Sequence, residues 1–205
     1  MRGGRQEEMR NVVNLRSYCS VSCTLVLLDL QQESIAAPKP YSIPIPKAEA
    51  AIENCRWALA HAREMGFPVA FLRMVGRAPF FNPMLSYSHW IPGFEPLTSE
   101  MVFERSMPSC YANREFGHVM TESGGHFVLA GFSGETGCLA TAIEAFHRGH
   151  SVTYLADASA SRGVNQIPAA SVHETVVELI GLYGEVTTTQ SWISEQSASV
   201  SRERV

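Results

Sequence analysis

The chain has 205 residues, of which 45% are hydrophobic and 18% charged, and it can therefore bury the core of one globular domain. Its net charge of −4 does not favour binding to nucleic acid or to a membrane surface, and no apolar run approaches the roughly 20 residues of a membrane span. The five cysteines lack the spacing of a metal site or a disulfide framework, so we expect a cytoplasmic protein.

The first half of the chain predicts two strands separated by a helix. Residues 1–20 are polar, lack the apolar core of a secretory signal and are predicted to be an extension before a domain over 21–193. A continuous apolar run at 24–28, ending in Asp29, is typical of a strand buried on both faces. A helix is expected over 47–65, closed by Gly66, and a second strand over 68–72.

The second half begins with a long loop and continues the alternation of strands and helices. The loop, 75–100, is rich in proline and aromatic residues and is expected to cover a pocket. Strands are predicted at 101–103, 127–130, 151–156 and 185–188, with helices at 109–122, 137–149 and 171–183. Residues 194–205 are predicted to be a polar tail. This alternation favours an α/β fold with a parallel sheet and helices on both faces.

Cys138 lies just after a glycine-rich turn that joins a predicted strand to a predicted helix. At the first turn of a helix, free N–H groups and the positive end of the helix dipole stabilise a thiolate. The same N–H groups can hold an oxyanion. The alternative is a buried structural cysteine.

Two carboxylates, Asp29 and Asp157, end predicted strands and would lie at the same sheet edge as Cys138. An aspartate there can take the thiol proton and deliver it to a leaving amine, although a loop or helix cap is the alternative for each. A catalytic Cys–His pair is the other possibility, and only His89 and His118 lie on segments that could approach Cys138. No metal-ligand spacing and no nucleotide-binding glycine motif is present, so we expect no metal and no cofactor.

Several segments together resemble the isochorismatase-like cysteine hydrolases, the superfamily of isochorismatase, nicotinamidase and N-carbamoylsarcosine amidohydrolase. The segments are Leu25–Gln31, Gly93–Leu97, Val102–Tyr111, Gly134–Ala142, Arg148–His150 and Asp157–Ser159. The resemblance implies a three-layer α/β/α sandwich with a mainly parallel, Rossmann-like sheet of about six strands. It also implies an Asp–Lys–Cys triad, in which Asp29 is the base and Cys138 the nucleophile.

The lysine position of that triad falls on Arg105, which keeps the positive charge but carries a larger fork of donors. The turn residues Ser133, Gly134 and Gly137 are predicted to frame the oxyanion, and the family's non-proline cis peptide would fall near Ser133–Gly134. The missing Asp-x-His motif disfavours a metal and nicotinamide.

Four further residues are candidates for substrate binding: Gln31, Arg73, Trp90 and Tyr111. Arg73 could meet a substrate carboxylate, with Trp90 and Tyr111 as pocket walls. A surface arginine and core aromatic residues are the alternative.

Three functions remain open at this point. The first is hydrolysis of a non-peptide C–N bond in a small amide, carbamoyl or ureido substrate through a thioester. The second is isochorismatase-type cleavage of a vinyl ether with Asp29 as the acid, and the third is a non-catalytic binding protein, because Arg105 replaces the lysine. The resemblance also implies a homodimer or homotetramer.

Overall fold

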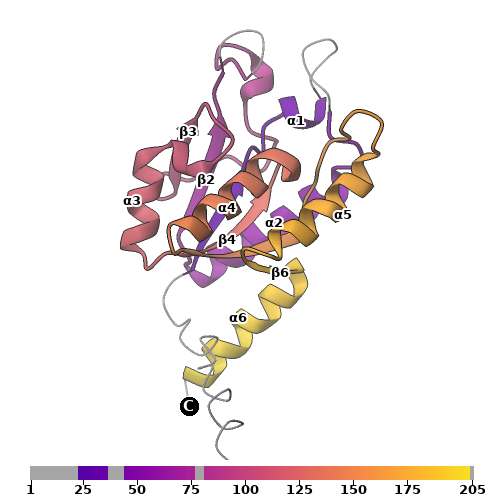
Figure 1. The fold of residues 1–205 in the computed structure, drawn as a ribbon. Helices are drawn as coiled ribbons and strands as arrows, with labels where there is room; N and C mark the ends of the chain where they lie inside the picture. The colour runs from indigo at the N-terminus through magenta and orange to yellow at the C-terminus, as the bar shows by residue number, and fades with distance from the viewer. Residues whose placement is uncertain (1–22, 37–43, 77–80, 204–205) are drawn as a thin grey trace, which may run out of the picture.

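A six-stranded sheet forms the centre of the computed structural model, which describes residues 23–36, 44–76 and 81–203 (Figure 1). The predicted extension, residues 1–20, lies outside these ranges. The strand order is β3-β2-β1-β4-β5-β6, and all neighbours are parallel, as the alternation of elements predicts. The strands are β1 (Thr24–Leu28), β2 (Val69–Met74), β3 (Met101–Arg105), β4 (His126–Gly131), β5 (Ser151–Ser159) and β6 (Glu185–Thr187).

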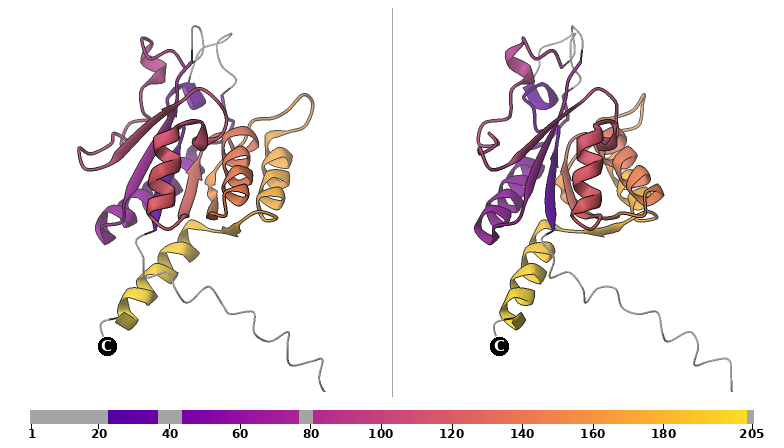
Figure 2. Two further views of the ribbon diagram at one scale, coloured as in Figure 1. Left: turned by 60° about the vertical axis from the view of Figure 1, so that its left-hand side comes forward. Right: turned by 90° about the vertical axis from the view of Figure 1, so that its left-hand side faces the viewer.

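Helices cover both faces of this sheet and complete a three-layer α/β/α sandwich (Figure 2). One face packs against α2 (Glu49–Met65) and the start of α6 (Thr189–Glu203). The other packs against α3 (Arg114–Glu122), α4 (Leu139–His147) and α5 (Ala169–Ile180). Four short helical segments complete the described fold: α1 (Glu33–Ala36), η2 (Ser86–Ser88), η3 (Cys110–Ala112) and η4 (Gly134–Cys138).

The apolar run of β1 is continuous because the strand is buried on both faces. Leu25 and Leu27 belong to the core under α2, whereas Val26 and Leu28 belong to the core under the opposite helical layer. The predicted helix end at Gly66 is confirmed, because this glycine has a φ of 70° and donates its N–H to the last carbonyls of α2. Within the described residues, none of the helices has the length and apolar character to cross a membrane.

The structure corrects two predictions near the carboxyl end of the chain. Asp157 does not end a strand, because β5 continues to Ser159. Its Oδ1 accepts hydrogen bonds from the N–H and Oγ1 of Thr189, at 2.7 and 2.8 Å, where α6 begins. The segment from 194, predicted as a polar tail, continues α6, which is anchored by the buried Trp192. The carboxylate of Asp157 therefore caps a helix, which is the alternative that the sequence left open.

Replacing Asp157 by alanine should lower the free energy of unfolding by about 1–2 kcal/mol, because the first N–H of α6 loses its acceptor. Asp157→Asn should cost less, since its amide oxygen can still accept. Urea denaturation measures both variants. A loss of hydrolytic activity at unchanged stability would contradict this assignment and return Asp157 to the reacting centre.

Candidate active site

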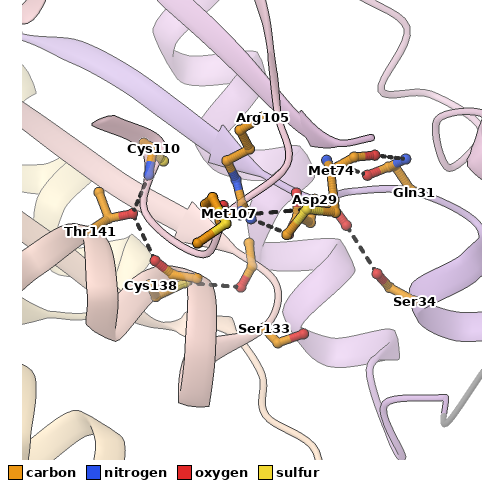
Figure 3. A network of polar contacts seen from close by, with 12 residues as sticks. Asp29, Gln31, Ser34, Met74, Arg105, Met107, Cys110, Ser133, Cys138 and Thr141 are labelled. Carbon is orange, nitrogen blue, oxygen red and sulfur yellow. Dashed lines mark hydrogen bonds and ion pairs between the residues drawn. The ribbon is translucent and has the colours of Figure 1, made fainter. Parts of the chain in front are cut away.

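The three predicted catalytic residues come together at the carboxyl edge of the sheet. Asp29 follows β1, Arg105 ends β3, and Cys138 closes the turn that follows β4. The neighbours β1 and β4 lie at the point where the strand order reverses, which is where open α/β sheets form ligand crevices. Figure 3 shows Arg105 between the Cys138 turn and Asp29.

Asp29 and Arg105 form a buried ion pair through Oδ2 and Nη2, and the same guanidinium donates from Nη1 to the carbonyl of Met107. Asp29 is 6% exposed and Arg105 3%. Burial raises the pKa of Asp29 from 3.8 to about 6, because the loss of hydration outweighs the attraction of Arg105. Oδ1 of Asp29 is buried and has no hydrogen-bond partner in the described structure, so it is available to a proton.

Asp29 also has an unusual backbone, with a φ of 50°. Non-glycine residues rarely adopt this left-handed conformation, and aspartate tolerates it better than most. Such conformations concentrate at functional sites.

The Cys138 thiol is fully buried, and its Sγ donates a long hydrogen bond to the carbonyl of Gly131, at 3.8 Å. Burial raises the pKa of Cys138 well above its usual value, and the negative groups around it act in the same direction while Arg105 opposes them. The predicted lowering of this pKa by a helix N-terminus is therefore wrong for the resting structure. The thiol is neutral at physiological pH until a base removes its proton.

The backbone of the turn before Cys138 explains why the start of the helix does not lower the pKa of this thiol. A π-helical turn, η4, precedes α4, so the helical segment begins at Gly134 instead of at the cysteine. The N–H of Cys138 donates to the carbonyl of Ser133 at 3.2 Å, and the N–H of Gly134 donates to the carbonyl of Ala160 at 2.9 Å. These two N–H groups are therefore engaged in the resting structure, and the oxyanion role of Ser133, Gly134 and Gly137 stays a prediction. The cis peptide lies between Phe132 and Ser133, one bond before its predicted place.

The glycines of this turn are required by close approach to β1. Gly131 has a φ of 114°, and a Cβ there would lie 2.2 Å from the carbonyl oxygen of Leu28. A Cβ on Gly137 would lie 2.8 Å from Cδ2 of Leu28 and 3.1 Å from Nη2 of Arg105. The guanidinium thus bridges from the Asp29 carboxylate to the backbone of the nucleophile turn.

Gln31, predicted to contact substrate, is directed to the backbone. Its Oε1 accepts from the N–H of Met74 at 2.9 Å, and its Nε2 donates to the carbonyls of Met74 and Ser88 at 3.2 and 3.0 Å. This side chain is fully buried, so it braces the loops after β1 and β2.

The other predicted substrate residues also lie outside the Asp29–Arg105–Cys138 cluster. Arg73 pairs with Glu104 on the neighbouring strand, and its guanidinium lies 5.9 Å from the ring centre of Trp90. The hydroxyl of Tyr111 lies 2.7 Å from Nδ1 of His150. Their roles in substrate binding stay predictions.

Sequence reasoning missed a second guanidinium at this edge. Arg162, just beyond β5, bonds to the Ser133 hydroxyl and pairs with Glu135 at 3.6 Å. Its charge also acts to lower the pKa of Asp29. The only signal in the sequence was its position, five residues after Asp157, in the segment that follows a predicted strand.

Histidine and metal chemistry find little support in the described ranges. His89 and His118, the two histidines on segments that could approach the cysteine, are exposed. Within those ranges, no group of three or more His, Cys, Asp or Glu side chains is arranged to hold a metal ion.

Comparison with known proteins agrees with this geometry. The family model described as an isochorismatase domain matches residues 23–191. The uncharacterized isochorismatase family protein YddQ of Bacillus subtilis (strain 168) is 25% identical over 182 residues, covering 84% of this chain and 99% of that protein.

Solved structures show the same fold. An isochorismatase from Pseudomonas putida KT2440 has a TM-score of 0.76 at 27% identity and covers 83% of this chain and 90% of its own. A cysteine hydrolase from Pseudomonas syringae pv. phaseolicola 1448A has a TM-score of 0.75 at 17% identity and covers 87% of this chain and 93% of its own. The second similarity supports the fold alone.

Proposed function

Because the chain belongs to the isochorismatase family of hydrolases, we propose that it is a cysteine hydrolase of a non-peptide C–N bond in a small amide, carbamoyl or ureido compound. The observation that carries the proposal is the burial of a thiol, an unpartnered carboxylate oxygen and a guanidinium at one sheet edge. The groups belong to Cys138, Asp29 and Arg105.

The first step is a proton transfer coupled to attack on the substrate. With a pKa of about 6, Asp29 is ionised at neutral pH, and its Oδ1 accepts the proton of the Cys138 thiol. The sulfur then bonds to the substrate carbonyl carbon, and the carbonyl electron pair moves to oxygen. The high pKa of the resting thiol makes this base necessary.

Arg105 supports the negative charge that develops. Its Nη2 lies against the backbone of Gly137, and a guanidinium keeps its charge in proteins. As the oxyanion collapses, the C–N bond breaks and the protonated Asp29 gives its proton to the departing amine. Water then attacks the thioester with Asp29 again as the base, releasing the acid and restoring the thiol.

Replacing Arg105 by lysine should lower kcat/KM about 10- to 100-fold, because a lysine keeps the charge but loses the fork that joins Asp29 to the Met107 carbonyl. Arg105→Met should lose more, roughly another 10²-fold, since the charge is gone. Steady-state kinetics rank the three proteins. Equal activity of the lysine and methionine variants would show that the charge is not used.

A second candidate is cleavage of a vinyl ether with Asp29 as the acid. The raised pKa of Asp29 favours it, because a carboxyl that titrates near 6 is partly protonated near neutral pH. This reaction needs no thiol, so a Cys138 variant separates the two candidates.

The experiment that tests the proposal is an ammonia- or amine-release screen of small amides, carbamoyl compounds and ureides with wild-type protein and Cys138→Ala. Release that depends on Cys138 supports it. Release from no compound, or release that persists in the variant, contradicts it. The proposal includes a homodimer or homotetramer, which light scattering on the same sample measures.

A further inference from the structure

One buried tyrosine hydroxyl has no place in the mechanism above. Tyr154 lies in β5, is fully buried and shares an apolar core with Cys138. Within the described structure its hydroxyl makes no hydrogen bond of good geometry, although the side chains of Ser159 and Cys138 lie within reach of it. Leaving such a group unpaired in a dry interior costs free energy, so an unpaired hydroxyl that persists calls for a functional explanation.

Regular pairing between β4 and β5 places this hydroxyl beside the nucleophile turn. Tyr154 pairs with Leu129, two residues before Gly131 ends β4, and the register shifts only beyond this pair, where Gly131 meets Ser159. Oη of Tyr154 lies 3.3 Å from the position that a Cβ on Gly134 would take. The glycine therefore leaves room for the hydroxyl inside the turn that carries the cysteine.

The polar side chains that act on Tyr154 are those of Cys138, Ser159 and Glu135. Burial raises the pKa of Tyr154 well above its usual value, and the negative charge that Cys138 can carry raises it further. The phenol therefore keeps its proton and remains a hydrogen-bond donor.

Among the described residues, the groups around a Cys138 thiolate offer charge and not a dedicated hydrogen bond. The N–H of Cys138 already donates to Ser133, and Arg105 favours ionisation of the sulfur through its charge while it is bonded to Asp29. The groups that oppose ionisation of the sulfur are those of Cys110, Asp29 and Glu135. A neutral O–H in this environment stabilises the anion without adding charge, since hydrogen bonds to an ionised acceptor are the stronger ones.

We propose that Tyr154 is a positioning residue whose hydroxyl donates a hydrogen bond to Sγ of Cys138 when the sulfur is a thiolate. This inference rests on the proposed function, because that function requires the thiolate. The thiol proton goes to Oδ1 of Asp29, the phenol keeps its own proton, and S–H is the only bond that breaks.

The test is Tyr154→Phe in the full chain, with Tyr183→Phe as the matched control, because the Tyr183 ring packs on Phe146 in the outer helical layer. The rate of iodoacetamide alkylation at Cys138 is followed by peptide mass spectrometry across a wide pH range. On the plateau above the titration of Asp29, Tyr154→Phe should react about tenfold more slowly than wild type, the equivalent of one pKa unit. The inflection near pH 6 should stay, and Tyr183→Phe should match wild type.

An unchanged or faster plateau in Tyr154→Phe would overturn the inference. Loosened packing exposes a buried thiol and speeds its alkylation, so a structural defect has the opposite sign to the expected effect. The thermal midpoint of Tyr154→Phe should not fall, since the deleted hydroxyl made no hydrogen bond of good geometry. An alkylation profile of wild type without an inflection near pH 6 would contradict the proposed function but not the inference on Tyr154. The test of Tyr154 is then the apparent pKa of the Cys138 thiol at high pH, which should be about one unit higher in Tyr154→Phe than in wild type.

Discussion

Cys138→Ala is expected to abolish amide hydrolysis, with a fall in kcat of roughly 10³- to 10⁶-fold, the range seen when a covalent nucleophile is removed. Cys23 and Cys55 lie in the core on the opposite face of the sheet, and Cys110 shares the core of Cys138 but lies on η3, outside the nucleophile turn. The matched control is Cys55→Ala. Cys55 is equally buried, but its thiol donates to the carbonyl of Ala158 under α2, on the opposite face of the sheet.

Both variants are assayed on the compound found in the release screen, with folding checked by circular dichroism. Cys55→Ala should keep the activity of the folded protein even if its thermal midpoint falls. Amide hydrolysis that survives in Cys138→Ala would remove the thioester from the mechanism. Turnover of isochorismate by the same variant would favour the acid-catalysed cleavage instead.

Asp29→Asn is the second large effect and should lower kcat/KM by about 10³-fold, because the amide can still accept a bond from Arg105 but cannot take the thiol proton. The pH dependence carries a defined sign. Burial raises the pKa of Asp29 to about 6, so the carboxyl is protonated and unable to act as a base below that pH. Wild-type kcat/KM should therefore rise as the pH passes through about 6.

In Asp29→Asn, the rise of kcat/KM through about pH 6, which is the acid limb of the pH profile, should disappear along with most of the activity. Asp157→Asn makes the same chemical change in β5, which β4 separates from β1, and should leave the pH dependence in place, because its carboxylate caps α6. A limb near pH 6 that persists in Asp29→Asn would assign the titration to another group.

The sequence was informative where chain order alone decides position. The buried run that ends in Asp29 and the glycine turn before Cys138 predicted that the two residues share a sheet edge, and the structure confirms it. Periodicity also located the main helices, because their apolar faces meet the sheet.

What could not be predicted depends on irregular backbone. The extra turn at Gly134 uses the N–H of Cys138, which reverses the expected shift of the thiol pKa. The register of β5 shifts against β4 just beyond the pair of Leu129 and Tyr154, and neither feature leaves a periodic signal in the sequence. The last helix was missed because most of its residues are polar and only a few, such as Trp192, are buried.

The central claim is that Asp29 is the base for a buried, neutral thiol. The most direct measurement is the pH dependence of iodoacetamide alkylation at Cys138, read by peptide mass spectrometry in wild type and in Asp29→Asn. The account predicts an inflection near pH 6 in wild type, set by Asp29, and its loss in the variant, where the rate should rise only toward the high pKa of the thiol itself. One inflection near the free-thiol value of about 8.5 in both proteins would contradict it.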